Sequence, residues 1–104
     1  MDANKLLKNI KYLKQKKKLY DEIEKTDEKL DKIIKIYEAA FPTFTDRQKK
    51  AINIRYFKEN SLIDTALEMG WSEKTLYRDF KKIETTISKI SDEIDHDLNI
   101  DKYI

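Results

Sequence analysis

The sequence contains no cysteine, and its 104 residues include only one glycine and one proline. Without cysteine there can be no disulfide bond, thiol catalysis or cysteine-based zinc site. Apolar residues never run longer than three in a row, so we expect no segment that crosses a bilayer, and the lysine-rich start lacks the apolar stretch of a signal peptide. We therefore expect a cytoplasmic protein without a membrane partner.

Residues suited to catalysis are also scarce. His96 is the only histidine, so one chain can assemble neither a histidine-based zinc site nor a Ser-His-Asp triad. The acidic stretch from Asp95 to Asp101 does not fit a calcium loop, because Ile100 stands where such a loop needs glycine. We expect no enzyme activity, and predict no catalytic residue, no metal site and no cofactor.

Charged residues make up 40% of the chain and hydrophobic residues 39%. With so few turn residues, this mixture is typical of amphipathic helices with solvated outer faces. We predict an all-α fold, in which an N-terminal long helix or helical hairpin precedes a helix-turn-helix whose second helix extends into a long C-terminal amphipathic helix. The predicted segments are a helical N-terminal extension (1–41), a helix-turn-helix DNA-binding domain (42–90) and a solvated acidic C-terminal tail (91–104).

The net charge of +2 is unevenly distributed. Residues 1–20 hold seven lysines against one acid, residues 21–41 hold four lysines against seven acids, and residues 91–104 hold five acids against one lysine. The lysines of the first block could bind DNA phosphates, or could only solvate a helix. They could also pair with the acidic blocks and mask DNA binding.

Apolar residues recur at helical spacing between residues 4 and 41, with no glycine or proline. The periodicity is weakest at residues 15–18 and 24–29, and we favour a bend at the second stretch. Pro42 disfavours helical geometry at Phe41, which predicts a linker over residues 41–44.

Three N-cap signatures follow this linker. Thr45, with Gln48 three residues later, begins a helix to about residue 58. Ser61 caps a short helix that ends at Gly70, and Ser72 caps a further helix. The apolar positions of that last helix follow a heptad pattern sustained to about residue 98: Leu76, Phe80, Ile83, Ile87, Ile90 and Ile94. This heptad stripe could be a dimer seam or core packed against the N-terminal helices.

The stretch from Ser61 to Phe80 predicts two short helices that cross at a tight turn. Ala66 supplies a small side chain at the closest approach, Gly70 accepts a positive φ, and Leu76 anchors the second helix. With Leu76 and Phe80 in the core, the opposite face carries side chains that can reach bases and phosphates. The predicted motif core is Ala66, Gly70, Leu76 and Phe80. The predicted DNA-binding residues are Ser72, Glu73, Lys74, Tyr77, Arg78 and Lys81.

The sequence FTDRQKKAINIRYFKENSLIDTALEMGWSEKTLYRDFKKIE, which covers about residues 44–84, resembles the region-four helix-turn-helix of bacterial sigma factors. The matching pieces are Thr45 with Gln48, Arg55-Tyr56-Phe57, Ser61, Ala66, Gly70-Trp71-Ser72 and Thr75-Leu76. With its helical N-terminal extension, the chain is more similar to phage-encoded regulators of the ArpU/RinA type than to complete sigma factors. It departs from the region-four pattern at residues 62–65 and at Asp79, which leaves the target sequence unpredicted.

This resemblance implies a sequence-specific transcriptional regulator, encoded by a phage or prophage, that binds double-stranded DNA. RNA polymerase is a further candidate partner. We also expect a homodimer, because a single helix-turn-helix buries little DNA surface. Two alternative functions stay open. One is a phage DNA-packaging recognition subunit, since small terminase subunits carry a similar motif, although usually before their other helices. The other is a protein-interaction module that keeps the helix-turn-helix shape without using DNA.

Overall fold

The computed structural model describes residues 1–104 and contains helices but no strands. The α-helices are α1 (Ala3–Glu22), α2 (Glu28–Ala40), α3 (Asp46–Ile52), α4 (Leu62–Met69) and α5 (Glu73–Asp95). Three short helices complete the fold: the 3-10 helices η1 (Phe41–Thr43) and η3 (Asp101–Tyr103), and the π-helix η2 (Asn53–Phe57). The predicted all-α fold class is confirmed.

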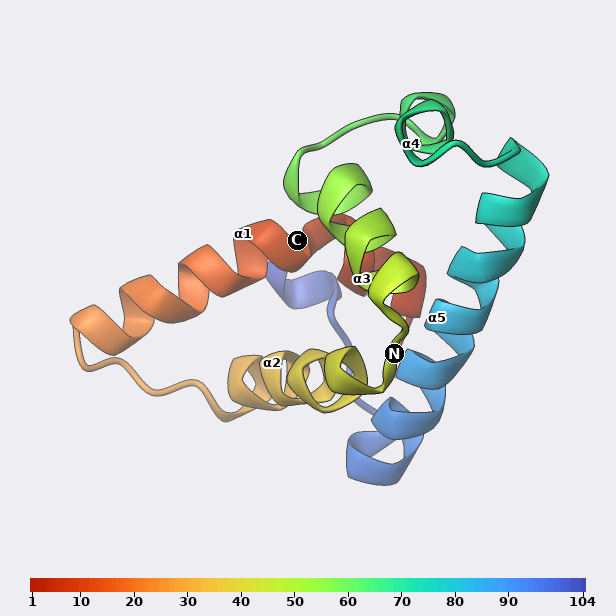
Figure 1. Cartoon of the computed structure of the whole chain (residues 1–104). Helices are drawn as coiled ribbons and strands as arrows, with labels where there is room; N and C mark the ends of the chain where they lie inside the picture. Colours follow the sequence, from red (N-terminus) through yellow and green to blue (C-terminus); the bar gives the residue numbers. More distant parts are fainter.

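The helices surround one core (Figure 1). α1 and α2 lie on one side of the molecule, α5 lies on the other, and α3 is placed between them. α2 packs along α5, and α1 packs against α2 and η2. α4 lies at one end of the molecule beside the start of α5, away from α1 and α2. The N-terminal helices therefore support α5 from one side, and α4 supports only its beginning.

The N-terminal region consists of two helices, and the break between them falls at residues 23–27. Glu24 has a positive φ of 55°, which turns the chain after α1. Asp27 then caps α2, because its carboxylate accepts hydrogen bonds from the backbone N–H groups of Lys29 and Leu30, each at 3.1 Å. The break overlaps the second of the two weak stretches in the apolar periodicity, as predicted.

The prediction that Pro42 ends helical geometry at Phe41 is wrong. Phe41 has helical angles (φ −55°, ψ −45°), and residues 41–43 continue α2 as a 3-10 helix. Proline is tolerated in the first turn of a helix, where its missing N–H would have no helical partner. The chain becomes extended only at Phe44 and Thr45, with ψ values of 152° and 161°.

Buried residues from all three predicted segments form one hydrophobic core. Its fully buried large side chains include Leu6, Leu7, Ile10 and Leu13 of α1, Leu30, Ile33 and Ile36 of α2, and Leu76, Ile83 and Ile87 of α5. The ranges 1–41, 42–90 and 91–104 thus differ in composition and charge, but their apolar side chains pack in the same core.

The heptad stripe of α5 is mostly core of the single chain. Leu76, Phe80, Ile83 and Ile87 are buried, Ile90 is partly buried, and only Ile94, at 42%, is exposed. Because α2 packs along α5, the inner face of α5 is occupied within the monomer. Of the two interpretations of this stripe, the structure supports packing against the N-terminal helices.

The predicted solvated tail is wrong for its apolar residues. α5 ends at Asp95 rather than near residue 98, and Leu98, Ile100 and Tyr103 are buried in the core. We call residues 96–104 the C-terminal strap. The strap lies against the N-terminal helices, since the Tyr103 hydroxyl donates a hydrogen bond of 2.7 Å to Asp27 Oδ1. The acids of the strap remain at the surface, and its apolar side chains complete the core.

Candidate nucleic-acid interface

The capping residues predicted from sequence all act as helix caps. Thr45 and Gln48 form a capping box, with bonds of 3.0 and 3.1 Å between each side chain and the backbone N–H of the other. Ser61 Oγ accepts a hydrogen bond from the N–H of Asp64 at 3.0 Å, and Ser72 Oγ accepts one from that of Thr75 at 3.1 Å. These caps set where α3, α4 and α5 begin.

The turn between α4 and α5 has the geometry that the motif requires. Gly70 adopts φ 70° and ψ 28°, a left-handed conformation that side-chain-bearing residues rarely adopt. A Cβ at this position would meet no atom within 4 Å, so the backbone angle rather than space demands glycine. The N–H of Trp71 then donates to the carbonyl of Ala66 at 2.9 Å and closes the end of α4.

The other three residues of the predicted motif core are buried. Ala66 of α4 is buried in the same core as Leu76 and Phe80 of α5. The ring of Tyr56 meets Phe80 edge to face, with centroids 5.5 Å apart. These contacts pack the beginning of α5 against α4 and η2.

The opposite face of α5 is open to solvent and carries the predicted DNA-binding residues. Glu73, Lys74, Arg78 and Lys81 are exposed, and Tyr77 is 53% exposed. Lys74 and Arg78 lie one helical turn apart and form no ion pair. This face therefore presents two cations without a carboxylate partner.

Two of the predicted residues have partners within the protein. Ser72 is occupied as the cap of α5, and its hydroxyl also bonds to Thr75 Oγ1 at 2.9 Å. Lys81 Nζ lies 3.5 Å from Glu84 and 5.1 Å from the centroid of the Tyr77 ring. The nearby Glu84 carboxylate raises the pKa of Lys81 above its usual value. Lys81 is therefore a less available cation than Lys74 or Arg78.

Asp79, which departs from the region-four pattern, is directed toward α3 rather than outward. Gln48 Nε2 donates a hydrogen bond of 3.3 Å to Asp79 Oδ1. The same Gln48 side chain closes the capping box of α3 through its oxygen. Gln48 thus links the start of α3 to the exposed helix, and Asp79 serves packing rather than base contact.

Two arginines that lie beside the motif were not among the predicted DNA-binding residues. The guanidinium of Arg47 stacks over Trp71, with 3.9 Å between its carbon and the ring centroid. The guanidinium of Arg55 lies near the rings of Tyr56 and Phe80, at 5.5 and 5.9 Å. One signal could have found them, because all three arginines of this lysine-rich chain fall between residues 47 and 78.

Most lysines of α1 are engaged within the protein. Lys5 contacts Asp101 of the strap at 2.8 Å, and Lys17 contacts Asp21 at 2.6 Å and Asp31 at 2.9 Å. Hydrogen bonds to these two carboxylates raise the pKa of Lys17. Two further lysines lie near aromatic rings: Lys14 near Tyr37 and Phe57, and Lys16 near Tyr12, Tyr20 and Tyr103. The basic first block is thus partly neutralised by the acidic block and the strap, one of the three outcomes considered from sequence.

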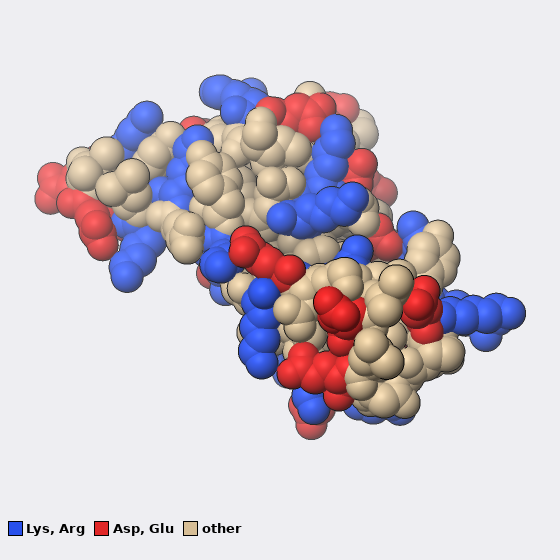
Figure 2. All heavy atoms as spheres, turned by 90° about the horizontal axis from the view of Figure 1, so that it is seen from above, with Lys and Arg blue, Asp and Glu red and all other residues tan.

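The surface has no single field of positive charge on the face shown in Figure 2. Lysine and arginine side chains alternate there with aspartate and glutamate. Binding to an anion on this face would therefore depend on local groups of cations. No helix is both long and apolar enough to span a membrane, and no group of three or more His, Cys, Asp or Glu side chains could hold a metal ion.

No protein-family model, curated protein or solved structure matches this chain. The resemblance to sigma region four and to ArpU/RinA-type regulators accordingly rests on the residues quoted for it.

Proposed function

We propose that this protein is a sequence-specific, double-stranded DNA-binding transcriptional regulator of the ArpU/RinA type, encoded by a phage or prophage. The single observation that carries the proposal is the outer face of α5, where Lys74 and Arg78 are exposed and unpaired beside a glycine turn. The inner face of the same helix is locked into the core by Leu76 and Phe80. A rigid helix that presents donors on one face is what major-groove recognition needs.

The side chains differ in what they can contribute. Arg78 can pair its fork with a guanine, and Lys74 can reach a base edge or a phosphate. Tyr77 can contact a thymine methyl group, and Glu73 can accept from cytosine and disfavour other bases. Lys81, close to Glu84, serves as a phosphate contact one turn further along.

The test selects bound fragments from the native genome and measures affinity for the selected site across a range of salt concentrations. We expect Arg78→Ala to cost about 1–3 kcal/mol at that site and to relax its sequence preference. Lys89→Ala is the matched control, because it removes an exposed lysine from the distal part of the same helix. The proposal is overturned if no fragment binds at low salt, or if folded Lys74→Ala and Arg78→Ala proteins bind as the control does.

A second candidate function, a protein-interaction module, is favoured by the exposed side of α4. Ile63 is 55% exposed and Leu67 is 74% exposed, although both are large and apolar. A homodimer or a contact with RNA polymerase has to use a surface other than the heptad stripe, and α4 offers one. Sedimentation of the wild type and of Leu67→Glu tests for a homodimer through α4. Such a dimer should dissociate in the variant, whereas a protein that uses α4 only for another partner should be monomeric in both forms.

A further inference from the structure

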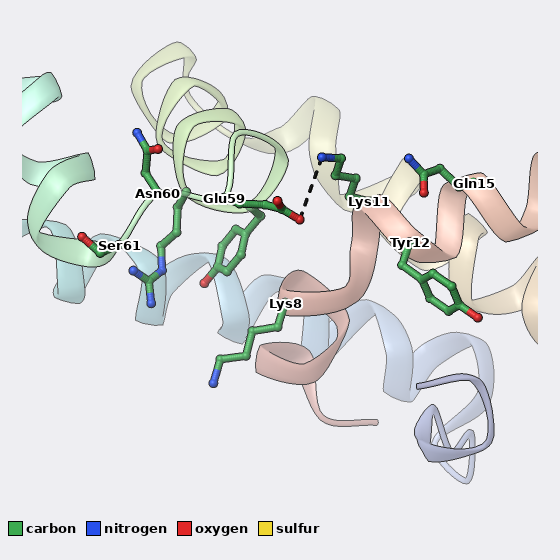
Figure 3. Close-up of a pocket in the computed structure, with 9 residues that line it drawn as sticks. Lys8, Lys11, Tyr12, Gln15, Glu59, Asn60 and Ser61 are labelled. Carbon is green, nitrogen blue, oxygen red and sulfur yellow. Dashed lines mark ion pairs between the residues drawn. The ribbon is translucent and has the colours of Figure 1, made fainter.

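A groove of about 720 Å³ lies between α1 and the segment that links η2 to α4 (Figure 3). Its lining includes three cationic side chains, Lys8, Lys11 and Arg55, and one anion, Glu59. The five other lining residues are uncharged, and three of them are Gln, Asn or Ser with hydrogen-bonding side chains. The groove therefore has more positive than negative charge and many polar groups.

Only one of the three cations has a carboxylate nearby. Lys11 and Glu59 reach toward each other across the groove, with 3.9 Å between Nζ and Oε1 (Figure 3). Both side chains are largely exposed, so this pair is weak and easily exchanged for another anion. Lys8 and Arg55 form no ion pair.

Lys8 is the cation of α1 in this groove that has no ion-pair partner. Lys5 and Lys17, on the same helix, contact acids at 2.6–2.9 Å. Lys8 has no such partner and extends from α1 below the Lys11–Glu59 pair in Figure 3. A multivalent anion in the groove could bind without displacing a close ion pair.

The groove also reaches α5 through two of its lining residues. Arg55 lines it and lies 5.9 Å from the ring centroid of Phe80, while Tyr56 lines it and packs on the same ring. Phe80 directly precedes Lys81 on α5. Two lining residues of the groove therefore lie against α5 at Phe80, which is next in sequence to the exposed Lys81.

We propose that this groove binds phosphate groups, through Lys8 and Arg55, and that Glu59 competes with the phosphate for Lys11. The source that the position favours is the sugar–phosphate backbone of a duplex whose major groove receives α5. In that form the inference rests on the proposed function. A free nucleotide offers the same phosphate chemistry and is the other source that the experiment distinguishes.

Substitutions at Glu59 and at the cations of the groove should change phosphate affinity in opposite directions. Removing a positive charge from the groove should weaken phosphate binding, whereas removing the negative charge of Glu59 should strengthen it. Glu59 has a positive φ of 60°, so Glu59→Gln keeps the size of the side chain and leaves the backbone demand unchanged. A gain in affinity from that variant would be hard to explain by damage to the fold.

The first experiment compares Lys8→Gln with Lys18→Gln, which removes an exposed lysine of α1 outside the groove. Duplex affinity should fall roughly three- to tenfold for Lys8→Gln, with the salt slope smaller by about 0.9, the value for one lost phosphate contact. Glu59→Gln should raise affinity severalfold, and Lys18→Gln should change it little.

The second experiment tests the groove without DNA. Pyrophosphate, and separately a nucleoside triphosphate, is titrated into the isotope-labelled full chain and followed by two-dimensional NMR. Amide shifts at residues 8–12 and 59–61 that weaken in Lys8→Gln support the site. If these shifts occur while Lys8→Gln and Lys18→Gln bind duplex equally, the site holds a free phosphate ligand. If no shift occurs and the two variants bind duplex equally, the phosphate site is overturned.

These outcomes are independent of the proposed function. Loss of the effect of Arg78→Ala on duplex binding would sink the recognition role of α5, yet the pyrophosphate titration would still decide on the groove. Conversely, duplex binding that depends on Arg78 but not on Lys8, together with no amide shift from pyrophosphate, would keep the recognition role of α5 and reject phosphate binding by the groove.

Discussion

α1 and α5 are both long amphipathic helices with lysine-rich outer faces, but their cations stand in different situations. On α1, Lys5 and Lys17 contact carboxylates, and Lys14 and Lys16 lie near aromatic rings. On the first half of α5, Lys74 and Arg78 have no ion-pair partner. The helix with more lysines is therefore not the one whose charge is most available.

The reason for the difference lies in the neighbours of each helix. α1 is flanked by α2, which begins with several acids, and by the acidic C-terminal strap. The beginning of α5 lies away from α2, beside α4 and in contact with α3 and η2 (Figure 1). A count of charges along a sequence thus gives the number of cations, whereas their neighbours in the fold decide which of them can contact a ligand.

The largest expected effect tests whether the inner face of α5 supports its outer face. Leu76 is fully buried, so Leu76→Asp places a charge in the core and should lower the free energy of unfolding by more than about 4 kcal/mol. Ile94→Asp is the control on the same helix, because Ile94 is 42% exposed and its replacement should cost less than about 1 kcal/mol. Thermal unfolding by circular dichroism measures both, and similar losses would contradict the described packing.

A smaller effect separates the two helices by what their lysines do. Lys74→Gln should weaken binding of the selected site by about 1 kcal/mol and leave the melting temperature unchanged. Lys17→Gln should instead lower the melting temperature and leave DNA affinity unchanged. Lys17 contacts two carboxylates, and it lies neither in the groove nor on the exposed face of α5. Binding titrations and thermal melts on the same samples test this, and a loss of DNA affinity in Lys17→Gln would break the comparison.

The C-terminal strap should contribute a similar or smaller free energy to stability through Tyr103. Tyr103→Phe removes the hydrogen bond to Asp27 and should lower the free energy of unfolding by roughly 0.5–1.5 kcal/mol. Loosening the strap should also free Lys5 and Lys16, so nonspecific DNA affinity at low salt should rise. Equal nonspecific affinity in wild type and Tyr103→Phe would show that the strap does not withhold the lysines of α1.

This contact also has a pH dependence with a definite sign. The hydrogen bond from Tyr103 lowers the pKa of Asp27, so its stabilisation is present above the ordinary value near 3.8 and is lost as pH falls through the lowered pKa. Burial, together with the bond to Asp27, raises the pKa of Tyr103 to about 12, so stabilisation present below pH 10 is lost as pH rises toward 12. Denaturant unfolding across pH should show both losses in the wild type and weaker ones in Tyr103→Phe.

The smallest expected effect concerns Ser91 on the distal half of α5. Its side chain is fully buried, and its hydroxyl has no hydrogen-bond partner. Ser91→Ala should therefore be neutral or should stabilise the protein by up to about 1 kcal/mol, with unchanged DNA affinity. Denaturant unfolding checks the sign, and a clear destabilisation would mean that the hydroxyl has a partner in solution.

Much of the fold could be predicted because its signals are local. Thr45, Ser61, Ser72 and Gly70 each act on the backbone within a few residues, and the structure has all four in the predicted roles. The apolar spacing of α5 likewise identified its buried face. Helix ends were harder to predict, since Phe41 remains helical before Pro42 and α5 stops before Leu98.

What sequence reasoning missed depends on residues that are distant along the chain. The burial of Tyr103 needs Asp27, the engagement of Lys5 needs Asp101, and the groove joins Lys8 to Arg55. No periodicity or capping motif contains such pairs. The exposed face of α5 was predictable because it follows from the buried face of the same helix, whereas the groove between α1 and η2 required the whole fold.

The sparse anchoring of α4 has a consequence for motion. The buried residues of α4 are the small Thr65 and Ala66, whereas α5 buries the large apolar side chains of Leu76, Phe80, Ile83 and Ile87. Local opening of α4 should therefore need less free energy than global unfolding, and its amide hydrogens should exchange with solvent earlier than those in the middle of α5. If the motif binds only when α4 is folded against α5, local opening of α4 lowers the population that can bind. A ligand that stabilises the packed position of α4 would slow amide exchange there first.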